Sequence, residues 1–127
     1  MPTKLILSDL AGSVLGAAIE VHRELGPGLL ESAYERCLVH ELAGRGIGCR
    51  AQVALPVIYK GVEIECGYRL DILVEETLIL EIKSVDRLMP IHEAQILTYL
   101  RLARLRQGFL INFNVGRVKD GIRSFVL

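Results

Sequence analysis

The stretch YRLDILVEETLILEIK, residues 68–83, constrains the fold more than any other part of the chain. Two runs rich in large and β-branched apolar residues flank Glu75-Glu76, which predicts two antiparallel strands joined by a tight turn. With the register centred on position 76, residue 71 faces residue 81 and residue 69 faces residue 83. Side chains alternate between the two faces of a strand. One face is therefore expected to be wholly apolar, with Leu70, Ile72, Val74, Leu78, Leu80 and Ile82 packed on a helix.

The opposite face of this hairpin carries Asp71, Glu81 and Lys83. Residues paired across antiparallel strands have Cβ atoms roughly 5 Å apart, so two carboxylates there would repel each other. A divalent cation between them would turn that repulsion into ligation, and hard oxygen ligands suit Mg²⁺ or Mn²⁺. A solvated outer face is the alternative, but Leu73 and Ile79 share this face and favour a half-buried cleft.

The rest of the chain predicts an α/β fold around a mixed sheet. Ser8 or Asp9 is suited to cap a helix that ends near Leu25, and a second helix follows Gly26-Pro27-Gly28. The further expected elements are a helix over 29–43, strands within 51–59 and 62–68, a helix from Pro90, a buried strand over 108–115, and a hairpin of strands 116–119 and 122–126 about Asp120-Gly121.

The 127 residues predict a single domain, residues 1–127. Within it we expect an additional N-terminal helix over 1–26, a core over 28–114 and a C-terminal hairpin over 116–127. Close packing or a dimer face is expected at Gly12 and Gly16, so a homodimer is a candidate assembly.

Charge and cysteine content narrow the functional classes. The formal net charge is zero, which gives no general attraction to nucleic acid or to an anionic membrane. The balance hides an acidic body and a basic end, since residues 96–127 contain six basic residues and one acidic residue. This arrangement is compatible with a phosphate chain beside a metal site; solvated surface charge is the simpler alternative.

Three cysteines without a Cys-x-x-Cys spacing argue against a disulfide framework and against zinc, although Cys37 and His40 have the spacing of two ligands on one helix face. The sequence contains no signal peptide pattern and no apolar run long enough to span a bilayer. We therefore expect a cytoplasmic protein without a membrane partner.

Further polar residues flank the hairpin in the sequence. Glu31 falls in the first turn of the second helix, where an acid also interacts favourably with the helix dipole. Gln95 and Tyr99 are four residues apart on the third helix, and His92 precedes them by one turn. Each signal is weak alone, because Gln95 could be a surface residue and Tyr99 a core residue.

The ordered set of segments resembles the PD-(D/E)xK nuclease superfamily. Glu31, Asp71, Glu81-Ile82-Lys83 and Gln95 occur in the order and spacing of that superfamily. The chain looks most like the GxxExxY proteins, whose motif matches residues 28–34. The resemblance covers GPGLLESAYE, YRLDILV, LEIK, IHEAQILTYL and FLINFNV with KDGI. The proline of the superfamily name is replaced by Leu70 here.

This resemblance implies a restriction-endonuclease-like core of the order α-βββ-α-β and a set of functional residues. Glu31, Asp71 and Glu81 would ligate Mg²⁺ or Mn²⁺, with the backbone carbonyl of Ile82 as a further ligand. Lys83 would act on the attacking water and the phosphate, and Gln95 would orient the site. The residues expected to contact substrate are Tyr99, Tyr34, His92 and Arg69.

Two hypotheses from different classes follow from the resemblance. One is a metal-dependent nuclease that hydrolyses phosphodiester bonds, with DNA as the expected nucleic-acid partner. The other is a non-catalytic nucleic-acid-binding or regulatory protein that retains the fold, which the neutral charge and small size favour. A purely structural domain would require all five motif segments to be coincidental.

Overall fold

The computed structural model describes residues 9–127, so the expected cap at Ser8 lies outside the described residues. The helices are α1 (Asp9–Leu25), α2 (Glu31–Gly44) and α3 (Pro90–Ala103), and a short 3-10 helix, η2, covers Val118–Gly121. The strands are β1 (Cys49–Ala54), β2 (Val57–Tyr59), β3 (Val62–Ile64), β4 (Arg69–Val74), β5 (Leu78–Lys83), β6 (Gln107–Asn112) and β7 (Ile122–Val126).

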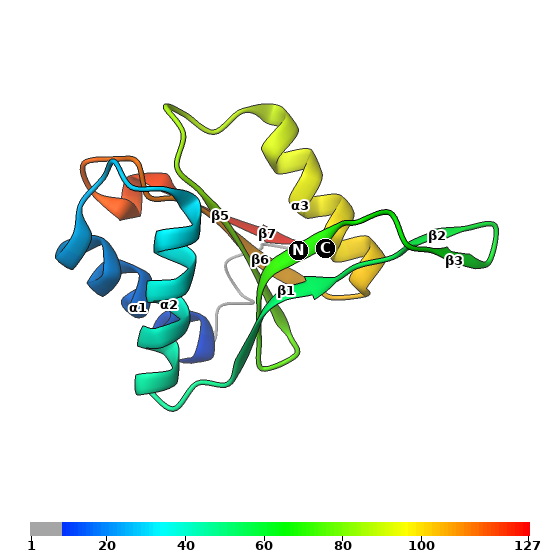
Figure 1. Cartoon of the computed structure of the whole chain (residues 1–127), viewed down its shortest axis with the longest axis horizontal. Coiled ribbons are helices and arrows are strands. Elements are labelled where there is room, and N and C mark those ends of the chain that lie inside the picture. The colour runs from blue at the N-terminus through cyan, green and yellow to red at the C-terminus, as the bar shows by residue number, and fades with distance from the viewer. Residues whose placement is uncertain (1–8) are drawn as a thin grey trace.

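Five strands form a mixed sheet in the order β1-β4-β5-β6-β7. Only β5 and β6 run parallel, and α3 supplies the crossover that a parallel pair requires. Strands β2 and β3 pair with each other as a separate two-stranded arm that projects from the body (Figure 1). The core order α2-β1-β4-β5-α3-β6 confirms the expected α-βββ-α-β arrangement, with the arm inserted between β1 and β4.

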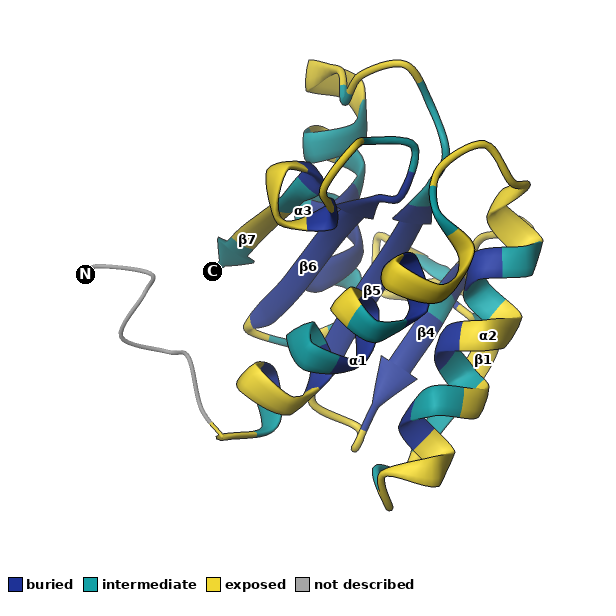
Figure 2. Cartoon of the chain, turned by 90° about the vertical axis from the view of Figure 1, so that its left-hand side faces the viewer, coloured by how far each residue is buried: buried dark blue, intermediate teal, exposed yellow. Residues whose placement is uncertain are grey.

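Helices cover both faces of the sheet, so its central strands are buried on two sides (Figure 2). Helices α1 and α2 bury one apolar cluster against β4, β5 and β6, and it includes Val14, Ala17, Leu38, Ile72 and Leu80. Helix α3 buries a second cluster on the other face: Leu55, Leu70, Leu73, Ile79, Tyr99 and Leu100. Leu73 and Ile79 are thus core residues beneath α3.

The β4–β5 hairpin has the expected register, with Ile72 paired to Leu80 and Leu73 to Ile79. Glu75 and Glu76 both adopt positive φ, at 51° and 58°, which is the conformation of a primed two-residue turn. The backbone N–H of Gly48 donates to the Glu75 carboxylate at 2.7 Å. One side chain of the apolar face differs from expectation: Leu70 is buried with the cluster beneath α3.

The C-terminal segment differs from the expected hairpin. Residues 118–121 form η2 instead of a strand and tight turn, and β7 pairs antiparallel with β6, matching Gln107 to Val126. The turn residue Gly121 lies against the chain: a Cβ there would approach the Asn112 carbonyl oxygen to 2.2 Å. The last strand therefore extends the main sheet at the edge formed by β6.

The close backbone packing expected at Gly12 and Gly16 is absent from the described part of the chain. A Cβ at Gly12 would meet nothing within 4 Å, and one at Gly16 would approach only the Arg45 guanidinium. A search of residues 9–127 finds no helix with the length and apolar character needed to cross a bilayer.

Candidate active site

At Asp71 on β4 and Glu81 on β5, side-chain carboxylates accept hydrogen bonds from the backbone of the neighbouring strand. The backbone N–H of Ile82 donates to Asp71 Oδ2 at 2.8 Å. The backbone N–H of Asp71 donates to Glu81 Oε2 at 3.2 Å. The regular pairing of β4 with β5 ends at Ile72 and Leu80. Each carboxylate is therefore held between the two strands.

Glu81 lies in an unfavourable place for a negative charge. The residue is only 4% exposed. Burial and the nearby charge of Asp71 together raise the pKa of Glu81 to about 8, against the lowering effects of its backbone hydrogen bond and of Lys83. Burial also raises the pKa of Asp71, and Glu31 adds to that rise. Two neighbouring acids with raised pKa values mark a candidate functional site.

Lys83 carries the positive charge that acts on both of these acids. It follows Glu81 by two residues on the same face of β5, and its charge lowers the pKa of both Asp71 and Glu81. None of the ion pairs formed within residues 9–127 includes Lys83, so its ammonium acts through the field and not through a direct contact. One ammonium offsets part of the charge of two carboxylates.

Glu31 reaches the site from the start of α2, and its local sequence explains how. Gly28 adopts a φ of +100° before the helix, which favours glycine. The Tyr34 hydroxyl donates to the Gly26 carbonyl at 2.5 Å and accepts from the Leu29 N–H at 3.1 Å. This hydroxyl fixes the linker, and Glu31 Oε2 then accepts a long 3.4 Å hydrogen bond from the Ser84 N–H just beyond β5.

Two polar residues of the site escaped the sequence analysis. Glu35 lies one turn after Glu31 on α2, and its pKa is raised by burial and by the charge of Asp71. Gln52 on β1 donates to Glu35 Oε1 at 2.9 Å and has a hydrogen bond to Asp71. The i, i+4 spacing of Glu31 and Glu35 was the available signal. Gln52 gave none, because its position depends on β1 pairing with β4.

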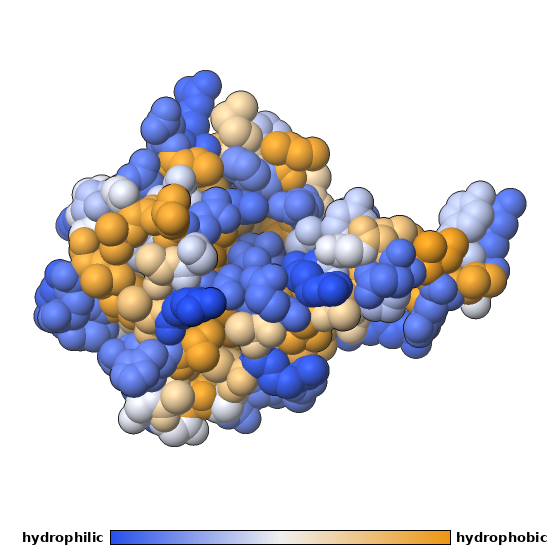
Figure 3. Space-filling model, viewed as in Figure 1, coloured by the Kyte–Doolittle hydropathy of each residue, from blue (hydrophilic) through white to orange (hydrophobic). Residues whose placement is uncertain are grey.

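Gln95 and Tyr99 border the same site from α3. Tyr99 is 6% exposed, and burial together with the charges of Glu81 and Asp71 raises its pKa. A hydrogen bond from the Gln95 side chain acts in the opposite direction. Figure 3 shows hydrophilic residues gathered in the hollow between α2, α3 and β1. The interactions among Asp71, Glu81, Lys83, Gln95 and Tyr99 place these residues in one region.

The structure gives the other predicted substrate residues different positions. Tyr34 is fully buried and stacks on Phe113 with centroids 4.6 Å apart, so it is a packing residue without a surface for substrate. His92 Nδ1 accepts from the Met89 N–H at 2.9 Å and caps α3. Arg69 is exposed and pairs with Glu65 at 3.6 Å. Ile82 is fully buried, and its carbonyl as a ligand stays a prediction.

The donor set fits a hard divalent cation by its chemistry. The carboxylate oxygens of Asp71 and Glu81 are hard donors, and a cation would offset the buried charge that raises their pKa values. Across residues 9–127, however, no group of three His, Cys, Asp or Glu side chains is arranged to hold a metal ion. Asp71 and Glu81 therefore supply two carboxylates at this place, and backbone oxygens, water or substrate oxygens are the other donors that such a cation takes.

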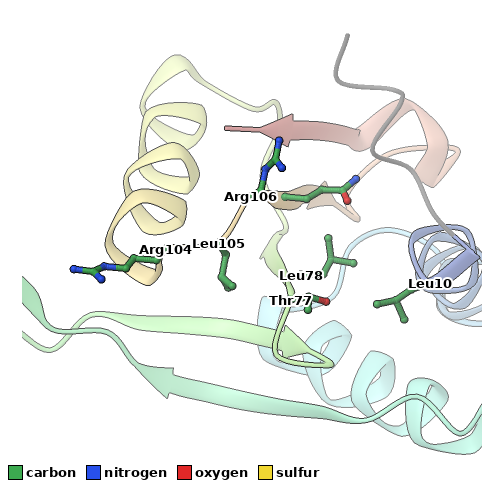
Figure 4. A pocket seen from close by; sticks show the side chains of 7 residues that line it. Leu10, Thr77, Leu78, Arg104, Leu105 and Arg106 are labelled. Carbon is green, nitrogen blue, oxygen red and sulfur yellow. The ribbon is translucent and has the colours of Figure 1, made fainter. Parts of the chain in front are cut away.

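A second hollow, of about 350 Å³, lies at the other end of the sheet (Figure 4). It is lined by Leu10, Thr77, Leu78, Arg104, Leu105, Arg106 and Gln107. The buried Gln107 amide nitrogen has no hydrogen-bond partner among the described residues. Because no carboxylate, imidazole or thiol of the described residues lines this hollow, it lacks the groups that hydrolytic chemistry requires.

Comparison with known proteins agrees with this geometry. The family model of the PD-(D/E)XK nuclease superfamily matches residues 8–125, nearly the whole chain. No curated protein and no solved structure matches the chain. The five-stranded mixed sheet flanked by helices is consistent with a restriction-endonuclease-like fold. The extent of the family match, from the start of α1 to the last strand, places this chain in the PD-(D/E)XK nuclease superfamily.

Proposed function

We propose that this protein is a nuclease that hydrolyses phosphodiester bonds of DNA with Mg²⁺ or Mn²⁺. The observation that carries the proposal is the pair of Asp71 and Glu81, held between two strands with raised pKa values that the charge of Lys83 offsets in part. No gain in stability accounts for such a pair, because burying like charges together is costly. Membership of a nuclease superfamily supports the same reaction class.

In this proposal Asp71 and Glu81 hold the cation, with Glu31 as the third carboxylate. Among residues 9–127 the Glu31 carboxylate accepts one hydrogen bond, a long one at 3.4 Å, so little in this part of the chain opposes its movement toward the pair. The bound cation would polarise the phosphate and lower the pKa of a water molecule. Glu35 would hold Gln52 through the 2.9 Å hydrogen bond, and Gln52 would in turn orient Asp71.

Lys83 would place its ammonium beside the phosphate. Its role is to stabilise charge that develops on the phosphate oxygens and to orient the attacking water. Gln95 would fix the Tyr99 hydroxyl at the edge of the site through their hydrogen bond. The burial of Glu81 would keep its carboxylate largely free of bulk water, which strengthens the electrostatic interactions that it makes.

We further propose that the chain is one of the GxxExxY proteins. Support comes from the separate physical roles of the three motif positions. Gly28 supplies positive φ, Glu31 extends toward the acids, and the Tyr34 hydroxyl joins the two sides of the linker. The motif is then a device for holding one carboxylate at the end of β5.

The test is cleavage of labelled single- and double-stranded DNA and RNA with Mg²⁺, Mn²⁺ or EDTA. We expect DNA cleavage that requires the metal and is lost in Asp71→Asn. The control is Asp120→Asn, which changes an exposed aspartate on η2. Cleavage that persists in Asp71→Asn, or no metal-dependent cleavage of any substrate, would contradict the proposal.

A non-catalytic nucleic-acid-binding protein is the second candidate. The observation in its favour is that residues 9–127 contain no complete three-ligand cluster. Fluorescence anisotropy separates the two functions: salt-sensitive binding of DNA without cleavage in any metal supports the binding protein and excludes the nuclease.

A further inference from the structure

A pocket of about 370 Å³ opens between α3 and the base of the β2–β3 arm. Its lining residues are Val57, Tyr68, Ile91, Ala94, Gln95, Thr98, Tyr99 and Leu102. Tyr99 belongs both to this pocket and to the carboxylate site, because the charges of Glu81 and Asp71 act on its hydroxyl. Tyr99 and Gln95 therefore border both the pocket and the region of the carboxylates.

The lining of this pocket is aromatic and aliphatic, without a charged side chain among the described residues that line it. The rings of Tyr68 and Tyr99 lie with centroids 6.1 Å apart and planes tilted by 58°. Tyr68 is 44% exposed and Ile91 is 70% exposed, so both can meet a ligand at the mouth. Gln95 supplies one amide for a hydrogen bond. Mostly apolar walls with a few uncharged polar groups, among them Gln95 and Thr98, match a nucleobase better than a phosphate.

The arm extends the apolar surface outward from this pocket. Val57 pairs with Ile64 and Tyr59 with Val62, which puts all four side chains on one face of the arm. Tyr59, Val62 and Ile64 are exposed, and a two-stranded hairpin alone is marginally stable in water. Figure 3 shows apolar residues along this projection. A ligand that runs from the pocket along the arm would cover them.

Charge also limits how this protein can hold a nucleic acid. The formal net charge of zero gives no general attraction to phosphates, so counterion release depends on the basic residues that contact them. Stacking of bases on aromatic rings is the other general source of affinity, and it requires bases that are not paired. Three of the four tyrosines, Tyr59, Tyr68 and Tyr99, lie on the arm or at the pocket, while Tyr34 is in the core.

We propose that the pocket formed by Tyr68, Tyr99 and Ile91 receives one unpaired nucleobase of the strand that is cut. The protein consequently acts on single-stranded DNA or on frayed and flapped ends in preference to fully paired DNA. This inference rests on the proposed function, because it assumes that the neighbouring carboxylates act on a phosphodiester.

The test measures coupling between the pocket and a single base. Single-stranded oligonucleotides that carry one abasic position, moved along the strand, are bound by wild type and by Tyr68→Ala in Ca²⁺ in place of Mg²⁺. We expect Tyr68→Ala to weaken binding of the intact strand about tenfold. When the abasic position falls at the pocket, binding by wild type should weaken by the same factor as Tyr68→Ala weakens binding of the intact strand. With that same abasic strand, Tyr68→Ala should bind no more weakly than wild type. Tyr68→Phe, which keeps the ring, should bind as wild type.

A second variant tests the pocket independently of Tyr68. Ile91→Glu introduces a negative charge at the mouth of the pocket, at a position exposed enough not to disturb folding. It should weaken single-strand binding, whereas Ile19→Glu on the distant helix α1 should not. A fully paired blunt duplex should be bound more weakly by wild type and be insensitive to Tyr68→Ala.

Several outcomes would overturn the inference. One is that the losses of affinity from Tyr68→Ala and from an abasic position multiply independently at every position of the strand. Another is equal binding of the intact strand by Tyr68→Ala and wild type. A third is a change in oligomeric mass in Tyr68→Ala, which would assign the pocket to a second copy. Metal-dependent cleavage without coupling between Tyr68 and any abasic position would overturn this inference alone. Coupled binding without cleavage in Mg²⁺ or Mn²⁺ would overturn the nuclease function alone.

Discussion

Asp71 and Glu81 each accept a hydrogen bond from the backbone of the facing strand, at 2.8 Å from Ile82 and 3.2 Å from Asp71. These bonds hold a half-buried carboxylate, that of Asp71, and a buried one, that of Glu81, at the point where the regular pairing of β4 and β5 ends. The sheet thus offers a rigid pair of oxygen donors in a place that disfavours negative charge.

Replacing Lys83 by alanine should lower kcat of metal-dependent cleavage by about 10² to 10³, the usual effect of removing one preorganised electrostatic group. Affinity for the cation should not fall, because a positive charge beside the carboxylates is removed. Single-turnover rates and metal titrations separate the two effects. Lys119→Ala, at an exposed lysine on η2, is the matched control. Wild-type kcat in Lys83→Ala would contradict the role.

Glu81→Gln should change how stability depends on pH in metal-free protein. The pKa of Glu81 is raised from 4.5 to about 8, so its contribution to stability is fully present below pH 4.5 and is lost as pH rises toward 8. The loss is at most about 1.4 kcal/mol per pH unit for one proton. The amide lacks this titration, so the variant should be more stable than wild type at pH 8.

Urea unfolding in EDTA between pH 4.5 and pH 8.5 measures this difference. Some slope should remain in Glu81→Gln, because the pKa of Asp71 is raised as well. Excess Mg²⁺ should flatten the wild-type profile, since the cation offsets the charge of the deprotonated pair. Parallel profiles for wild type and variant would show that Glu81 keeps an ordinary pKa.

Glu35→Gln should weaken Mg²⁺ binding about tenfold, the lower end of the range for residues that orient metal ligands. The variant keeps a side chain that Gln52 can contact, but it removes a negative charge next to Asp71. Calorimetric titration measures the affinity. Glu41→Gln on the same helix loses only an exposed ion pair with Arg45 and should bind Mg²⁺ normally.

Tyr34→Phe should lower the free energy of unfolding by about 1 to 3 kcal/mol, because the Leu29 N–H loses its partner in a partly buried place. DNA affinity of the folded protein should be unchanged, since the side chain is fully buried. Denaturant unfolding and anisotropy measure the two quantities. A variant with wild-type stability and weaker DNA binding would restore Tyr34 as a substrate contact.

The hairpin could be predicted from sequence because its information is local. The turn at Glu75-Glu76 and the apolar alternation fix the register, and the register places Asp71 near Glu81. The alternation could not tell that Leu73 and Ile79 are covered by α3, because a sheet buried on two sides has no polar face. Leu70 joins that same cluster near the end of the regular pairing.

Features that depend on contacts between distant segments were missed. Gln52 enters the site only through the pairing of β1 with β4, and β7 adds to β6 instead of folding back on residues 116–119. The turn signal at Asp120-Gly121 predicted a local hairpin, but these residues form η2 and the following strand pairs with the edge of β6. Glu35 was within reach of sequence reasoning, since it follows Glu31 by one helical turn on α2.

The most direct test of the account is Mn²⁺ binding followed by electron paramagnetic resonance on wild type, Asp71→Asn, Glu81→Gln and Asp120→Asn. We predict saturable binding of Mn²⁺ that Mg²⁺ displaces, that is lost in Asp71→Asn and in Glu81→Gln, and that is unchanged in Asp120→Asn. Equal Mn²⁺ binding by all four proteins, or none by wild type, would contradict a cation site at Asp71 and Glu81.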